Sequence, residues 1–267
     1  MKSVRHTSAF DVGVIVPVFR PGPHIPNIVK SLRNQTFKNF RVILIDDDHT
    51  DEFQNLKNSL LAVEDPDFVG RLVFLSTPCR ASGPAVARNV GLENSTEPFI
   101  SFFDCDDYWY PAFLEEMYRS ILSQSADVVV CHSVTNSGDR KIRLSLPANY
   151  ARRHLFQTNI LSMPCVMVRV DALREKSFPV SPVHEDYAFW LVNIHKGVRI
   201  TVLQQVLVDI TKTENSVSSP RFMSLVWFAK LIFSQPDARW LMPLYLTMYV
   251  FNAINKRYGF INRIVVF

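Results

Sequence analysis

The sequence predicts an α/β protein with a mostly parallel central sheet, flanking helices and a helical C-terminal extension. Short apolar runs alternate with amphipathic stretches through the first half of the chain, which is typical of βαβ units. The apolar runs are continuous rather than alternating in polarity, and this pattern indicates strands that are covered on both faces. A Rossmann-like arrangement of strands and helices follows from these two observations.

The predicted elements follow one another in a regular order at first. Strands are predicted at residues 12–18, 41–45, 72–75, 99–103 and 128–131, with helices at 23–35, 51–63, 84–92 and 111–122. Residues 132–160 are polar and irregular, and a strand at 164–170, a helix at 184–195 and a β-ribbon at 199–210 come next. Two apolar helices follow Pro220. We therefore expect one α/β domain over residues 1–219 and a helical extension over residues 220–267.

Composition excludes several classes of protein. The chain has 267 residues, 48% of them apolar and 20% charged, so it can bury a full core and is neither disordered nor fibrous. Its four cysteines stand far apart without a C-x-x-C pair, which argues against a disulfide framework or a zinc ribbon and fits a reducing compartment. Residues 1–11 lack the apolar segment of a signal peptide. We expect a cytoplasmic protein.

Positive charge gathers at the C-terminal end of the chain. Residues 221–267 carry six basic residues against Asp237 alone, whereas the remainder is nearly neutral. A general nucleic-acid binder would spread this charge over its folded body, so no nucleic-acid partner is expected. The longest uncharged apolar run of the tail, residues 241–251, is too short to span a bilayer. We expect the tail to pack through its apolar face on the domain or in a homodimer, with its basic face at the inner surface of the cytoplasmic membrane.

Acidic residues follow two predicted strands directly. Residues 43–45 run into Asp46-Asp47-Asp48, and residues 100–103 run into Asp104-Cys105-Asp106-Asp107. Ligands bind at the carboxyl ends of parallel strands, and carboxylates crowded there repel one another unless a cation or hydrogen-bond donors offset them. Mg²⁺ or Mn²⁺ would do so and would bring phosphates with it. The alternative for residues 46–48 is an ordinary loop or a helix N-cap.

These clusters belong to five segments that resemble the inverting nucleotide-sugar glycosyltransferases of family 2, which have the GT-A fold. The segments stand in the family's order and at its intervals, and together they cover roughly residues 12–218. They are Val14-Ile15-Val16-Pro17-Val18-Phe19, Ile45-Asp46-Asp47-Asp48-His49-Thr50-Asp51, Ala87-Arg88-Asn89-Val90-Gly91, Phe103-Asp104-Cys105-Asp106-Asp107-Tyr108-Trp109 and His184-Glu185-Asp186-Tyr187-Ala188-Phe189-Trp190.

The resemblance implies a donor site at the matching positions. Pro17, Val18 and Phe19 would lie beside the nucleotide base, and Asp47 would bond to its uracil-like edge. Arg88 would approach the donor's phosphates or the base pocket. From the residues alone, Arg88 is as well explained by a salt bridge on a helix surface.

The resemblance also implies a metal ion and a general base. Asp104 and Asp106 would form the metal site, with Asp104 also touching the ribose or the sugar and Asp106 holding an Mn²⁺ or Mg²⁺ that bridges the diphosphate. Asp186, supported by Glu185, would be the general base, and Met163-Pro164-Cys165 would border the acceptor and the donor sugar. Without the resemblance, Glu185-Asp186 is better explained as an acidic helix start.

The implied reaction moves a sugar from a nucleoside diphosphate sugar, a UDP-sugar first among them, to a polysaccharide or lipid-linked acceptor. The departing diphosphate needs its charge neutralised, and the acceptor hydroxyl must lose a proton to a positioned base. An inverting single displacement needs no nucleophile from the enzyme, and the chain has no G-x-S-x-G motif.

Two alternatives stay open at this point. The family often places Tyr-Arg-x-His before the Ser-x-Ser that ends at Ser218, and here only Lys212 supplies charge in that segment. This departure favours a degenerate sugar-nucleotide-binding subunit. A nucleotidyltransferase also uses aspartates at strand ends, but it would carry a glycine-rich basic phosphate loop that residues 13–22 do not offer.

Overall fold

The computed structural model describes residues 9–137, 140–148, 150, 152–157, 161–180, 185–211, 221–236 and 238–258. Its strands are β1 (Val12–Val18), β2 (Phe40–Asp46), β3 (Leu72–Ser76), β4 (Phe99–Phe102), β5 (Tyr108–Trp109), β6 (Val128–Ser137), β7 (Arg140–Leu144), β8 (Val166–Arg169) and β9 (Ile200–Thr211). Its α-helices are α1 (Ile25–Arg33), α2 (Asp51–Leu61), α3 (Pro66–Val69), α4 (Pro84–Glu93), α5 (Phe113–Ser123), α6 (Arg152–Leu155), α7 (Glu185–Asn193), α8 (Arg221–Phe233) and α9 (Met242–Tyr258). Short 3₁₀ helices are η1 (Gly22–His24), η2 (Met163–Cys165), η3 (Val170–Ala172) and η4 (Arg239–Leu241).

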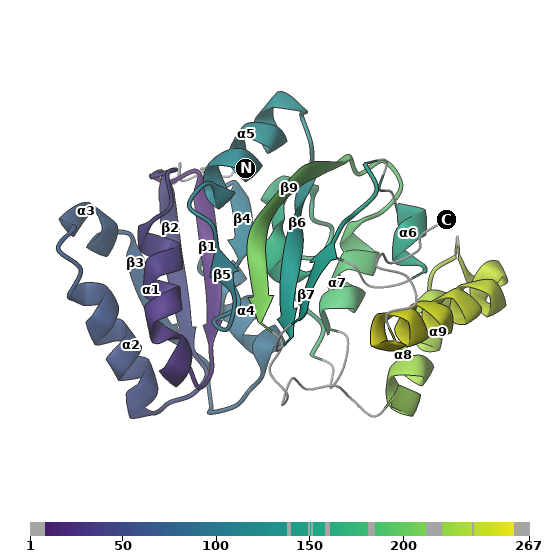
Figure 1. Ribbon diagram of the computed structural model, residues 1–267, viewed down its shortest axis with the longest axis horizontal. Helices are drawn as coiled ribbons and strands as arrows, with labels where there is room; N and C mark the ends of the chain where they lie inside the picture. The colour runs from purple at the N-terminus through teal and green to yellow at the C-terminus, as the bar shows by residue number, and fades with distance from the viewer. Residues whose placement is uncertain are drawn as a thin grey trace, which may run out of the picture.

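A single mixed sheet runs through the centre of the molecule (Figure 1). Its strand order is β3-β2-β1-β4-β8-β6-β9-β5, with β7 paired to β6. Strands β3, β2, β1 and β4 are parallel, so their carboxyl ends share one edge, and β6 and β9 form a second parallel pair. Strand β8 is antiparallel to both β4 and β6 and joins the two parts. The predicted fold class, an α/β sheet with flanking helices and C-terminal helices, is confirmed.

Several elements differ from the sequence prediction, and the helices α3 and α6 are two that it did not include. Strand β5 lies inside the second acidic motif, and β7 lies in the segment that was predicted to be irregular. The predicted β-ribbon over residues 199–210 is instead one strand, β9. It is hydrogen-bonded to β6 on one side and to β5 on the other, so its backbone groups are paired without a fold back onto itself.

Close packing of α4 on the sheet positions the site. A Cβ atom at Gly91 would lie 2.5 Å from Ile15 Cγ2, so only glycine lets α4 approach β1 this closely. The helix begins after Gly83, whose φ of 95° is a conformation that glycine adopts without strain. Arg88, one turn before Gly91, is thereby held beside the carboxyl ends of β1 and β4.

The C-terminal helices lie together at one end of the sheet, beside α6 and α7 (Figure 1). Phe228 of α8 is fully buried, and its ring stacks between those of Tyr187 and Tyr249, at centroid distances of 5.9 and 4.1 Å. The predicted packing of the tail on the domain is therefore confirmed. Apolar side chains such as Trp240 and Leu244 are exposed on the outward side, and the predicted basic face stays a prediction, because the side chains of Arg221, Lys256, Arg257 and Arg263 lie outside the described residues. No helix in the described part of the chain is long and apolar enough to cross a membrane.

Candidate active site

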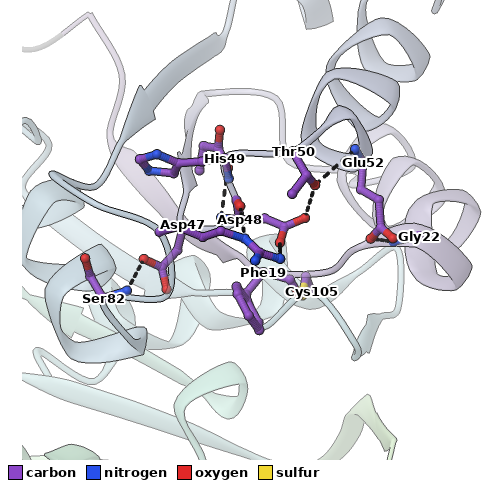
Figure 2. Close-up of polar contacts among 11 residues, drawn as sticks. Phe19, Gly22, Asp47, Asp48, His49, Thr50, Glu52, Ser82 and Cys105 are labelled. Carbon is purple, nitrogen blue, oxygen red and sulfur yellow. Dashed lines mark hydrogen bonds and ion pairs between the residues drawn. The ribbon is translucent and has the colours of Figure 1, made fainter.

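The first acidic cluster organises the loop that leads to α4. Asp47 is buried, and its carboxylate accepts hydrogen bonds from the Thr77 hydroxyl at 2.8 Å and from the amides of Ser82 and Gly83 at 2.8 and 2.9 Å. Figure 2 shows the contact with Ser82 at the end of β2. Three donors therefore offset the charge of Asp47, and the same bonds fix the start of α4. Its bond to the nucleotide base stays a prediction.

Asp46 and Asp48 are also engaged by local donors. Asp46 Oδ1 accepts from the amides of Asp48 and His49 at 2.9 and 2.8 Å, which closes a tight turn. The Asp48 carboxylate accepts a hydrogen bond from the Thr50 hydroxyl (Figure 2). Arg80 Nη2 lies 3.3 Å from Asp48 Oδ1. These local bonds are those of an ordinary loop, and Thr50 is the N-cap of α2.

The residues predicted beside the nucleotide base lie at the carboxyl end of β1. Val18 is fully buried and its carbonyl accepts the amide of Asp47 at 2.9 Å, so its side chain belongs to the core. Pro17 is half-buried in the same strand. Phe19 is 37% exposed beyond the strand end, and its carbonyl contacts Cys105 Sγ at 3.8 Å (Figure 2). The Arg20 guanidinium lies 5.0 Å from the centre of the Phe19 ring, and the place of these three residues beside a base stays a prediction.

The second acidic cluster meets a buried cation. Arg88 Nη2 lies 2.8 Å from Asp104 Oδ1, and Arg88 Nη1 lies 3.5 Å from Glu185 Oε1. The Arg88 side chain is 6% exposed. Burial lowers the pKa of its guanidinium, but Asp104, Asp186 and Glu185 raise that pKa by more, so the net shift is upward. The structure thus brings together four predicted site residues from three separate segments.

Arg88 also has unused hydrogen-bonding capacity. Its Nε and Nη1 atoms are buried and have no hydrogen-bond acceptor within the described residues, although Nη1 takes part in the ion pair with Glu185. A buried donor without an acceptor is costly, so an anionic ligand at this place would be favourable. The surface salt bridge considered from the sequence is excluded, because the guanidinium is almost fully buried.

Asp106 and Asp107 sit in a crowded acidic turn after β4. Burial and repulsion from Asp104 raise the pKa of Asp106, and the charge of His24 opposes this shift. Burial, Asp104 and Asp106 raise the pKa of Asp107 well above its usual range, although its carboxylate accepts the Thr211 amide at 3.0 Å. That bond brings the end of β9 to the motif. Lys212 lies outside the described residues.

Asp104 and Asp106 fit a cation that is shared with a ligand. In the described part of the chain, no group of three or more His, Cys, Asp or Glu side chains is arranged to hold a metal ion. Mg²⁺ is commonly bound by one or two carboxylates together with substrate phosphates. Two crowded carboxylates beside a buried arginine suit that mode, because a cation would relieve their repulsion.

The acidic pair Glu185-Asp186 forms the first turn of α7, at the same edge of the sheet as Arg88. Burial and repulsion from Asp186 raise the pKa of Glu185, whereas Arg88 lowers it. Asp186 Oδ1 accepts the amide of Tyr187 at 2.7 Å, as expected for an acidic residue at a helix start. The helix-start interpretation and the functional one are therefore compatible.

Two contacts that sequence reasoning missed hold this edge together. Asn89 exchanges hydrogen bonds with the backbone of Phe178, from its Nδ2 at 2.9 Å and to its Oδ1 at 2.6 Å. The Phe178 ring lies 5.5 Å from the Arg88 guanidinium. Asn89 stands in the motif at residues 87–91, so that motif could have indicated its role. Phe178 belongs to no motif that could have done so. Residues 163–165, which were predicted to border the acceptor and the donor sugar, are buried. The Pro164 carbonyl accepts the Trp109 indole N–H at 2.8 Å.

Comparisons with known proteins identify relatives of this chain. The family model for glycosyl transferase family 2 matches residues 13–175. An uncharacterized glycosyltransferase of Haemophilus influenzae is 28% identical over 92% of this chain and 97% of its own length. The Escherichia coli UDP-Glc:alpha-D-GlcNAc-diphosphoundecaprenol beta-1,3-glucosyltransferase WfgD is 26% identical over 80% of this chain and 82% of its own.

Solved structures show the same fold. Staphylococcus aureus TarS in complex with UDP-GlcNAc superposes with a TM-score of 0.70 at 21% identity, covering 94% of this chain and 73% of that one. The mannosyltransferase PcManGT of Pyrobaculum calidifontis, in complex with GDP-Man and Mn²⁺, gives 0.67 at 17% identity and covers 96% of this chain and 77% of that one. The fold is GT-A. With more than half of its length matched by the family model, the chain belongs to glycosyl transferase family 2.

Proposed function

We propose that this chain transfers a sugar from a UDP-sugar to a lipid-linked or polysaccharide acceptor, with inversion at the anomeric carbon. The observation that carries the proposal is the double ion pair of Arg88, which faces Asp104 at 2.8 Å and Glu185 at 3.5 Å. One buried cation thereby joins the predicted donor side, after β4, to the predicted acceptor side, at the start of α7. UDP-GlcNAc in TarS and the UDP-Glc and diphosphoundecaprenol in the name of WfgD support these substrate classes.

The donor would bind along the carboxyl edge of the parallel strands. Phe19 would cover the base, Asp47 would bond its edge through the lone pairs that its backbone partners leave, and Arg88 would donate to a phosphate oxygen from its buried Nε. Asp104 and Asp106 would hold Mn²⁺ or Mg²⁺. When bound, that ion would neutralise the charge that develops on the departing diphosphate.

Asp186 is the proposed general base. Glu185 faces the guanidinium of Arg88 at 3.5 Å, so its carboxylate is drawn toward the donor side. Asp186, the next residue on α7, would take the proton from the acceptor hydroxyl as that oxygen attacks the anomeric carbon. The bond from that carbon to the diphosphate oxygen breaks on the opposite side, which inverts its configuration.

The proposed place of action is the cytoplasmic face of the membrane, because a polyprenol-linked acceptor would lie there. The function is tested by incubating the full chain with UDP-sugars, Mn²⁺ and a diphosphate-linked acceptor. Product with inverted anomeric configuration by NMR is the expected result. Donor binding without any turnover would contradict the proposal and would favour the sugar-nucleotide-binding subunit.

Metal dependence has its own test. Asp106→Asn should leave the fold intact and abolish Mn²⁺-dependent binding of UDP by calorimetry. Asp171→Asn is the matched control, since the Asp171 side chain is 80% exposed on η3. Unchanged Mn²⁺-dependent affinity in the Asp106 variant would overturn the assignment of the cation to this turn.

A further inference from the structure

The C-terminal helices pack on the helix that carries Glu185 and Asp186. Phe228 is stacked between Tyr187 of α7 and Tyr249 of α9. At the other end of α7, Arg152 donates to the Leu191 carbonyl at 2.8 Å and to Gln235 Oε1, just after α8, at 2.9 Å. A surface on these helices therefore has a fixed position relative to the site.

The outward side of η4 and α9 is an apolar surface. Trp240 is 81% exposed, and Leu241, Leu244 and Phe251 are each about half exposed at 51, 54 and 48%. Leu244 and Phe251 stand seven residues apart on α9, so their side chains share one stripe of that helix. We call Trp240, Leu241, Leu244 and Phe251 the tail face. From Trp240 to Phe251 the sequence contains no charged residue.

One basic residue, Arg239, borders the tail face, and a second basic residue pairs with a tryptophan on α8. The Arg239 guanidinium lies 5.2 Å from the centre of the Trp240 ring, and Lys230 Nζ lies 5.5 Å from that of Trp227 on α8. Residues 221–267 carry six basic residues against one acidic residue. Tryptophan beside basic residues is typical of helices that lie at a membrane surface.

We propose that the tail face docks on an anionic lipid bilayer, with Trp240 and Leu244 entering the headgroup region. This inference rests on the proposed function, because a lipid-linked acceptor must be met at such a surface. A second copy of the chain is the less favoured occupant, since it would bring two net-positive tails together. The sequence predicted a basic face at the membrane; the proposed contact is instead an apolar face with Arg239 at its border.

Flotation with lipid vesicles tests the docking without any sugar transfer. The full chain should float with vesicles of phosphatidylethanolamine and phosphatidylglycerol, and less with phosphatidylcholine alone. Trp240→Glu and Leu244→Glu should each lower the partition coefficient by about tenfold or more, because a buried leucine-sized group is worth more than one factor of ten. Leu122→Glu is the matched control, because Leu122 is 47% exposed on α5, away from the tail.

The outcomes separate this inference from the proposed function. Loss of flotation in both tail variants, with transfer to a detergent-solubilised acceptor unchanged, is the expected result. Failure of the wild-type chain to float, or equal flotation of the tail variants, would overturn the docking while leaving the transferase proposal intact. A dimer by light scattering that Leu244→Glu dissociates would also overturn it, because the tail face would then cover a second copy.

Discussion

Arg88 Nη2 lies 2.8 Å from Asp104 Oδ1, and this ion pair joins α4 to the carboxyl end of β4. The same guanidinium reaches Glu185 of α7 at 3.5 Å. Three segments that are far apart in the sequence are therefore held at one point of the molecule. A buried cation between two carboxylates is costly to remove. Arg88 therefore stabilises the fold in addition to its proposed role in donor binding.

Replacing Arg88 with methionine is expected to lower the free energy of unfolding by about 3 kcal/mol, because two partly buried carboxylates lose their partner. Urea denaturation followed by circular dichroism measures the change. Arg119→Met is the control, since Arg119 also pairs with two carboxylates, Glu115 and Glu116, but is 61% exposed on α5. The control should change the free energy by no more than about 0.5 kcal/mol. Equal effects of the two substitutions would show that the burial of Arg88 adds nothing to the free energy of unfolding.

Glu185→Gln is expected to change how stability depends on pH. Burial and repulsion from Asp186 raise the pKa of Glu185 in the folded chain, so folding favours its neutral form. The wild type should therefore lose free energy of unfolding, relative to the glutamine variant, as pH rises from about 4 to about 7. Denaturation at both pH values measures this. Glu64→Gln is the control, because Glu64 is exposed. The prediction is contradicted if the wild type gains free energy of unfolding relative to Glu185→Gln as pH rises, or if Glu64→Gln shows the same pH dependence as Glu185→Gln.

Removing the ring of Phe228 should destabilise the whole chain and not only its tail. Phe228→Ala should cost about 3–5 kcal/mol of the free energy of unfolding, since the ring is fully buried. Phe233→Ala on the same helix is the control, because Phe233 is 65% exposed and should cost little. Denaturation monitored at α7 and at the tail should give one transition. Two separated transitions would mean that the extension folds independently of the domain.

The sequence allowed most of the fold to be predicted, because continuous apolar runs such as Ile43-Leu44-Ile45 lie in the buried centre of the sheet. It did not indicate β5, which is two residues long and depends on pairing with β9 far along the chain. The outward face of α9 was also missed. The tail is apolar on most sides, so periodicity cannot say which side faces the domain.

The candidate site shows the same division. Motif order placed Arg88, Asp104 and Glu185 in one site, and the structure brings them together. The sequence could not show that Asp47 would be engaged by Thr77, Ser82 and Gly83, because those bonds depend on the path of the loop after β3. Nor could it show Phe178, whose contacts with α4 arise only in the folded chain.

Close packing of Gly91 against Ile15 gives a further test of how Arg88 is positioned. Gly91→Ala should cost about 1–3 kcal/mol of stability, because the new Cβ would lie 2.5 Å from Ile15 Cγ2. Ile15→Ala removes that obstacle, so the double variant should be more stable than the sum of the two single effects predicts. A double-mutant cycle by urea denaturation measures the coupling. If the effects of the two single substitutions on the free energy of unfolding simply add, α4 moves away from β1 at no cost in stability.

The central claim is that Asp186 takes the proton of the acceptor hydroxyl at a site where the donor is bound by other residues. Asp186→Asn keeps the shape of the side chain and removes its ability to accept a proton. The most direct measurement is kcat for sugar transfer in this variant, together with the affinity for UDP in the presence of Mn²⁺. We predict that kcat falls by about 10² or more while the affinity stays near that of the wild type. Near-normal kcat in Asp186→Asn, with activity lost instead in Glu185→Gln, would contradict the account.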